Sequence, residues 1–178
     1  MRKLIVNISA FCLTFLLSSF SGLPVNNEQN RVVVSNDISP LRIGVAQIAS
    51  LKASLLYDLL DLEEKGLSKE AFEYAYKGYQ QLLKKNRISC PDYLTICDLS
   101  QSSRQKRLYV IDIRNNKIIS HTYVAHGKNS GGEYARKFSN RPESHQSSLG
   151  FYITKNAYSG EHGLSLRVVG LEPGFNDR

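Results

Sequence analysis

The sequence lacks the features that mark several large classes of protein. It has no low-complexity tract, and its 12 Gly and 5 Pro show no collagen-like repeat, which excludes collagen-like, mucin-like and wholly disordered chains. Despite a formal net charge of +7, it has no run of Lys and Arg with interleaved aromatic residues. Arg104, Lys106 and Arg107 form one short basic cluster, which we interpret as solvated surface. We therefore expect no nucleic-acid partner.

Common catalytic and ligand-binding motifs are also missing. Ser130 and Ser147 do not lie in a G-x-S-x-G segment, and phosphate-loop and dinucleotide-binding glycine patterns are absent. Cys90 and Cys97 are too far apart in the sequence for a Cys-x-x-Cys zinc motif. A disulfide between these two cysteines and a pair of reduced thiols are both compatible with the sequence. We expect neither a metal nor another cofactor.

The first 21 residues are typical of a secretory signal peptide. Arg2 and Lys3 precede a mostly apolar stretch at residues 4–17, and small residues follow, with cleavage expected after Ser21. The apolar stretch is shorter than the ~20 residues that span a bilayer, so we expect no stable membrane span after cleavage. An uncleaved anchor is the alternative. Export to the periplasm or cell envelope is the working hypothesis.

Two successive helices are predicted after a polar linker at residues 22–44. Between residues 45 and 62, apolar side chains recur at three- and four-residue steps, which predicts an amphipathic helix with one buried stripe. That stripe comprises Ile48, Leu51, Leu55, Leu59 and Leu62. Ser68 is a good N-cap for the second helix, in which Leu67 packs on Phe72. Pro91 prevents further helix, so residues 45–91 are predicted to form a helical hairpin.

Residues 92–178 have the pattern of a β domain, so the predicted fold class is α+β. Stretches rich in β-branched and aromatic residues predict strands at residues 93–99, 108–113, 117–124, 149–154 and 164–169. Asn115 and Asn116 predict a turn between the second and third of these strands. The polar segment from Gly127 to Ser148 predicts a long loop, which in a compact domain is often functional.

Two of the four histidines are followed directly by glycine. In His126-Gly127 and His162-Gly163, the glycine lets another backbone or a substrate approach the imidazole closely. Taken singly, each histidine is also compatible with a structural or surface role. Composition and spacing alone do not identify an activity.

Several segments in order resemble the bacterial murein L,D-transpeptidase catalytic-domain family (YkuD-type). The resemblance covers roughly residues 51–178. The segments that carry it are Leu67-Ser68-Lys69-Glu70-Ala71-Phe72, Lys106-Arg107-Leu108-Tyr109-Val110-Ile111-Asp112, Val124-Ala125-His126-Gly127-Lys128-Asn129-Ser130-Gly131, Phe138-Ser139-Asn140, Gln146-Ser147-Ser148-Leu149-Gly150-Phe151-Tyr152, His162-Gly163-Leu164-Ser165-Leu166 and Gly170-Leu171-Glu172-Pro173-Gly174-Phe175-Asn176.

The resemblance implies a peptidoglycan substrate and cysteine acyl-transfer chemistry. In that family a thiolate attacks a stem-peptide carbonyl and a histidine manages the proton. The resemblance implies substrate-binding positions at His126, Gly127, Ser148 and His162. The family's catalytic histidine and cysteine follow the Gly-Phe-Asn segment, and no residue of this sequence matches them. We therefore predict a partial β domain at residues 92–178, with no catalytic residue and no transpeptidase activity in this form.

Two hypotheses remain open at this stage. The chain is either a shortened form of an L,D-transpeptidase or a non-catalytic envelope protein that binds peptidoglycan stems. If the sheet lacks its final strands, residues 149–154 or 164–169 should show an unpaired edge and an uncovered apolar face. Such a protein would tend to associate, but the sequence does not assign an oligomeric state.

Overall fold

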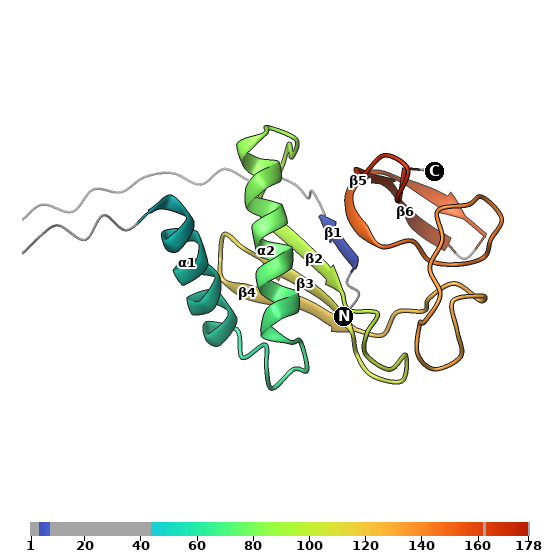
Figure 1. Ribbon diagram of the computed structural model, residues 1–178, viewed down its shortest axis with the longest axis horizontal. Coiled ribbons are helices and arrows are strands. Elements are labelled where there is room, and N and C mark those ends of the chain that lie inside the picture. Colours follow the sequence, from blue (N-terminus) through green and yellow to red (C-terminus); the bar gives the residue numbers. More distant parts are fainter. Residues whose placement is uncertain (1–3, 8–43, 162, 178) are drawn as a thin grey trace, which may run out of the picture.

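The computed structural model describes residues 4–7, 44–161 and 163–177, which form two helices and a six-stranded sheet (Figure 1). The elements are β1 (Leu4–Asn7), α1 (Val45–Leu59), α2 (Lys69–Lys84), β2 (Tyr93–Cys97), β3 (Leu108–Asp112), β4 (Lys117–Thr122), β5 (Gly150–Gly160) and β6 (Gly163–Gly170). The sheet order is β4-β3-β2-β1-β5-β6, and β1 and β5 are the only neighbouring strands in it that run parallel. These observations confirm an α+β fold.

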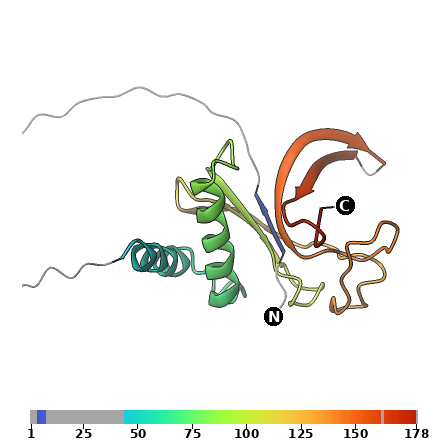
Figure 2. The same ribbon diagram turned by 45° about the horizontal axis from the view of Figure 1, so that its top comes forward.

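The strands lie close to where the sequence predicts them. The turn between β3 and β4 places Asn116 at a φ of 50°, a backbone conformation that asparagine tolerates better than most residues. β5 is the main difference, because it continues to Gly160 and forms a long antiparallel ribbon with β6. Figure 2 shows this ribbon curving away from the helices at one end of the sheet.

Helix α2 forms the centre of the hydrophobic core. Its N-cap, Ser68, accepts a 3.2 Å hydrogen bond from the backbone N–H of Ala71, as the sequence predicts. Its buried aromatic face packs on one face of the sheet; the cluster includes Phe72, Ala75, Tyr76, Tyr79, Leu94, Ile96, Tyr109 and Ile111. A Cβ at Gly78 would collide with the ring of Phe151, so this glycine lets α2 approach β5 closely.

Helix α1 begins where the sequence predicts and ends at Leu59, short of the predicted Leu62. Leu62 of the predicted stripe is buried, but the buried face of the helix itself is not the predicted one. Four members of the predicted stripe are more than half exposed, namely Ile48, Leu51, Leu55 and Leu59. The helix instead buries Ala53, Leu56 and Tyr57 against α2, and Leu60, just after its end, is buried as well. The Tyr57 hydroxyl donates a 2.6 Å hydrogen bond to the Leu67 carbonyl, which fixes this orientation. The segment therefore carries two apolar stripes, and packing selects the one that contains tyrosine and alanine.

Strand β1 comes from the segment that the sequence predicts as a signal peptide. Leu4 is paired with Cys97 of β2 on one side and with Gly150 of β5 on the other. The prediction left residues 1–21 out of the fold, whereas the structure uses four of them to join β2 to β5. Apolar and β-branched residues suit a strand as well as a signal peptide. Cleavage stays a prediction, and the linker at 22–44 lies outside the described residues except for Gly44.

Candidate functional site

The candidate site is built on the loop at residues 123–149, which joins β4 to β5. In Figure 1 this loop lies beyond the end of the sheet that carries β5 and β6, away from the two helices. Its two ends are held together by hydrogen bonds. The Asn129 N–H donates to the His145 carbonyl at 2.9 Å, and the Ser147 N–H donates to Ser130 Oγ at 2.8 Å. The loop is irregular, as predicted, and internal hydrogen bonds hold its two ends together.

Arg107 anchors the start of this loop, although the sequence places it in a surface cluster. That interpretation is wrong for Arg107, whose side chain is fully buried at 0% exposure. Its guanidinium donates to the Val124 carbonyl at 3.0 and 3.2 Å and to the Gln101 carbonyl at 2.8 Å. A planar guanidinium can satisfy several acceptors at once, which explains how this cation is accommodated in the interior. Burial lowers the pKa of Arg107.

His126 receives its orientation from Arg107. Arg107 Nη2 lies 2.7 Å from His126 Nδ1, and because a guanidinium only donates, Nδ1 must accept. The neutral ring then carries its proton on Nε2, which lies 3.2 Å from the Gly131 carbonyl oxygen. Both ring nitrogens are therefore engaged. In this state His126 is a positioning residue for the loop and is not free to act as a general base.

Gly127 and Ser148 lie at the two ends of the same loop cluster. The Gly127 N–H donates a hydrogen bond to Ser147 Oγ at 2.9 Å. This bond brings the segment that contains Ser148 next to the segment that contains His126. A Cβ at Gly127 would lie 2.5 Å from the His145 carbonyl oxygen, which explains why glycine is required there. Ser148 itself shares a 2.6 Å hydrogen bond with the Tyr152 hydroxyl on β5. Burial raises the pKa of Tyr152, so this hydroxyl stays neutral.

The structure thus brings three of the four predicted substrate-binding residues into one loop cluster. The fourth, His162, lies outside the described residues. The sequence missed Arg107, Ser130 and Tyr152 as members of the cluster. Ser130 is fully buried, and its Oγ and its carbonyl both accept hydrogen bonds from the loop. The resemblance pointed to segments that contain these residues, but their interactions depend on how the loop closes.

The turn after β6 supports the cluster from the other side of β5. Asn176 is 2% exposed, and its Nδ2 donates to the carbonyls of Leu149 and Phe151 at 3.1 Å each. Glu172 Oε2 accepts the Phe151 N–H at 2.8 Å. These bonds hold the start of β5, and with it Ser148 and Tyr152, at a fixed place. The Gly-Phe-Asn segment therefore has a structural role here.

Neither described cysteine is poised as a nucleophile in this cluster. No disulfide joins the two in the structure. Cys97 ends β2, and burial raises its pKa to about 12, so the thiol keeps its proton at neutral pH. Cys90 precedes β2, and its Sγ lies 4.0 Å from Asp92 Oδ2. Within the described residues no group of three or more His, Cys, Asp and Glu side chains could hold a metal.

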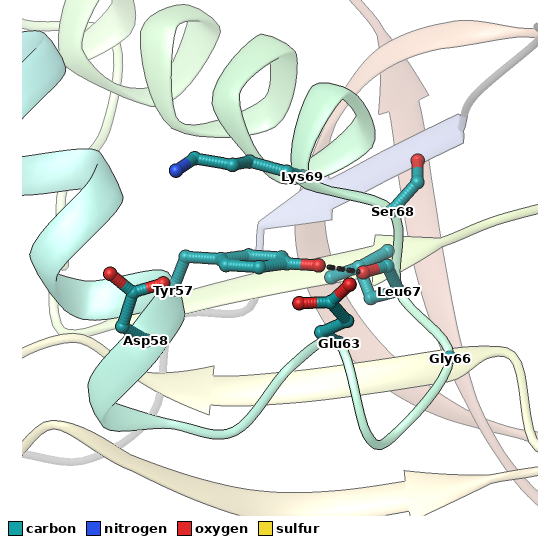
Figure 3. A pocket seen from close by; sticks show the side chains of 7 residues that line it. All are labelled: Tyr57, Asp58, Glu63, Gly66, Leu67, Ser68 and Lys69. Atoms are coloured by element: carbon teal, nitrogen blue, oxygen red, sulfur yellow. Dashed lines mark hydrogen bonds between the residues drawn. The ribbon is translucent and has the colours of Figure 1, made fainter.

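A pocket of about 400 Å³ lies elsewhere, at the connection between α1 and α2 (Figure 3). It is lined by Tyr57, Asp58, Glu63, Gly66, Leu67, Ser68 and Lys69. It shares no residue with the loop cluster. Its lining holds two carboxylates, Asp58 and Glu63, against one ammonium group, Lys69, so this pocket is a poor anion site. Among the described residues, moreover, no helix is both long and apolar enough to cross a membrane.

Comparison with known protein families identifies the family of this chain. The model of the L,D-transpeptidase catalytic domain matches residues 63–178, well over half of the chain. The chain belongs to the L,D-transpeptidase catalytic-domain family. No curated protein and no solved structure was found to match it. The L,D-transpeptidase match begins in the connection between α1 and α2, so it takes in α2, the whole loop cluster and the turn around Asn176.

Membership of the L,D-transpeptidase family implies a peptidoglycan substrate. The loop cluster offers backbone N–H and carbonyl groups together with serine and tyrosine hydroxyls, which suit hydrogen bonding to a peptide. Its buried cation, Arg107, is already satisfied by protein acceptors.

Proposed function

We propose that this chain is an exported peptidoglycan protein of the L,D-transpeptidase family that binds stem peptides at the loop cluster around Gly127 and Ser148. The observation that carries the proposal is the family match over residues 63–178. We assign the finer fold as a helical hairpin at residues 45–91 followed by a YkuD-type β domain. Family members use a cysteine thiolate for acyl transfer, in line with the resemblance described above.

We further infer that the 178-residue chain does not itself catalyse transpeptidation. No cysteine of the sequence lies in a segment that resembles the family's nucleophile segment. Of the two described cysteines, Cys97 is buried and keeps its proton at neutral pH. Cys90 precedes the strands of the β domain, outside the loop cluster. Chemistry of this class needs a thiolate beside a base, and the described residues present no such pair in the loop cluster.

Purified chain titrated with tetrapeptide muropeptides tests both statements. We expect saturable binding by calorimetry and no crosslinked product by mass spectrometry. Gly127→Ala should weaken binding at least tenfold, because the new Cβ displaces the His145 carbonyl. Gly132→Ala is the matched control, since its Cβ would meet nothing within 4 Å. No binding would refute the substrate assignment, and sustained thiol-dependent crosslinking would refute the inactivity.

Export is tested separately by the N-terminus of the native protein. Fractionation of cells should place the protein in the envelope, and N-terminal sequencing should begin at Gly22. Retention of residues 1–21 in a cytoplasmic protein would refute export. Cleavage would also remove β1, which pairs with both β2 and β5. In the processed protein, β2 and β5 must then pair with each other or with another strand.

A further inference from the structure

The contact between Arg107 and His126 depends on the protonation state of the imidazole ring. Arg107 Nη2 lies 2.7 Å from His126 Nδ1, and the guanidinium donates this hydrogen bond. A protonated imidazole carries a hydrogen on each ring nitrogen, so it has no lone pair left with which to accept. Uptake of a proton at Nδ1 would therefore replace the hydrogen bond with two donors and two positive charges that face each other.

Arg107 is fixed in place and keeps its charge. Its side chain is fully buried, and it also donates to the carbonyls of Val124 and Gln101. Burial lowers the pKa of Arg107, while the carboxylate of Asp98, which faces it from the segment after β2, acts in the opposite direction. A guanidinium stays charged in proteins. The repulsion must therefore be relieved by movement of His126.

The surroundings of His126 offer a charged ring no compensation. Within the described residues, no ion pair joins either ring nitrogen to an Asp or Glu side chain. The carboxylate of Glu133, on the same loop, already lies 3.6 Å from Arg104 Nε, and Lys128 adds a further positive charge two residues from the ring. Nε2 faces the Gly131 carbonyl, which can accept from the neutral and the charged ring alike. Protonation is thus opposed at Nδ1 and rewarded nowhere else.

His126 is bonded directly to the residue that joins the two ends of the loop. The Gly127 N–H donates to Ser147 Oγ at 2.9 Å, and the Gly127 carbonyl accepts the Ser130 N–H at 2.8 Å. The backbone is crowded here, because a Cβ at Gly127 would lie 2.7 Å from the Ser147 nitrogen. A displacement of His126 therefore shifts Gly127 and loosens the closure that places Ser148.

We propose that the Arg107–His126 contact is a pH-sensitive switch, which holds the loop cluster closed while the ring is neutral and releases it when Nδ1 takes up a proton. Histidine is the side chain whose charge ordinarily changes between pH 5 and 8. The stabilisation is present at the upper end of this range and is lost as the pH falls. As regulation of stem-peptide binding the switch rests on the proposed function, but its effect on the loop needs no ligand.

Hydrogen exchange of the ligand-free full chain at pH 8 and pH 5 tests the switch, with rates corrected for the intrinsic pH dependence of exchange. We expect protection in residues 124–131 and 144–148 to fall at least tenfold at pH 5. His126→Asn should keep its protection at both pH values, because an amide oxygen accepts from Arg107 and does not titrate. His145→Asn is the matched control on the same loop and should respond like the wild type, since asparagine tolerates the φ of 54° found there. An equal loss of protection in His126→Asn, or no loss in the wild type, would overturn the proposal.

Nitrogen NMR of the wild-type ring gives a second test that needs no substitution. At pH 8 the ring of His126 should carry its proton on Nε2 alone, with Nδ1 accepting. Uptake of the second proton should coincide with the loss of protection in the loop. A doubly protonated His126 in a loop that is still protected would refute the switch.

Muropeptide titration at the two pH values separates the switch from the proposed function. We expect the affinity of the wild type to be at least tenfold weaker at pH 5 than at pH 8. For His126→Asn the ratio of the two affinities should be close to one, whatever their absolute values. Absence of binding at both pH values would refute the peptidoglycan assignment, whereas the exchange rates would still decide whether the switch exists.

Discussion

The burial of Arg107 predicts a large difference between two neighbouring arginines. Replacing Arg107 by Met removes the donor to the carbonyls of Gln101 and Val124 and the partner of His126 Nδ1. Each hydrogen bond to a charged group contributes about 1.5–3 kcal/mol to stability. Removing the buried charge also removes its desolvation cost, which offsets part of this loss. We expect Arg107→Met to lower the free energy of unfolding by about 2–4 kcal/mol.

Arg104 provides the matched control in the same cluster. Its ion pair with Glu133 spans 3.6 Å, and its side chain is 83% exposed, so Arg104→Met should change stability by less than about 0.5 kcal/mol. Arg107→Lys should fall between the two, because an ammonium keeps the charge but cannot serve three acceptors in a plane.

Urea unfolding followed by circular dichroism measures these differences. For a chain of this length, a loss of 2–4 kcal/mol corresponds to a fall in Tm of about 4–16 °C. Hydrogen exchange in residues 123–149 should also accelerate in Arg107→Met, because the loop loses its anchor. Identical unfolding midpoints for Arg107→Met and Arg104→Met would refute the argument that Arg107 holds the loop.

Four further tests address the core, the helix cap and the buried thiol. Gly78→Ala should destabilise the protein by about 1–3 kcal/mol in urea unfolding, although alanine favours helices, because the new Cβ meets the Phe151 ring; a stabilised variant would contradict this packing. Ser68→Ala should cost about 1 kcal/mol in the same assay through loss of the α2 N-cap, and no change would argue against the cap. Iodoacetamide at neutral pH should spare Cys97 in the folded chain and modify it after unfolding in urea, because burial raises its folded pKa to about 12 from its ordinary value of 9.0; labelling of Cys97 in the folded chain would contradict this. Because that pKa is raised on folding, the contribution of Cys97 to stability is complete below about pH 9 and is lost as the pH rises towards 12, which unfolding curves at increasing pH would measure.

Local chemistry explains which parts of the fold could be predicted from the sequence. The N-cap at Ser68 and the turn at Asn116 depend on a few neighbouring residues, and both are found as predicted. The strand positions follow from period-two patterns and β-branched residues, which also act locally. β5 extends beyond its predicted end because pairing with β6 resumes at Ala157, after a register shift at the polar residues Lys155 and Asn156, and continues to Gly160.

Contacts between distant segments explain what the sequence could not show. Helix α1 has two apolar stripes, and only the position of α2 decides that Leu56 and Tyr57 are buried while Leu55 is exposed. Arg107 looks like a surface residue in its basic cluster, and its burial depends on a loop that closes over it from Val124 onward. The loop cluster was found through a resemblance that covers several segments, because no single motif in it identifies chemistry.

Residues 4–7 show why one sequence pattern can serve two roles. An apolar, β-branched segment can form the apolar core of a signal peptide. It can equally form the strand between β2 and β5, where backbone pairing imposes little sequence specificity. The two roles exclude each other in time, because a segment paired on both sides within a sheet is not available to be exported or cleaved. Export therefore requires that β1 be unpaired, and a processed chain must present the facing edges of β2 and β5 to each other or to another strand. Cleavage would therefore leave two facing strand edges in the sheet, and the stability of the chain should depend on whether residues 1–21 are still attached.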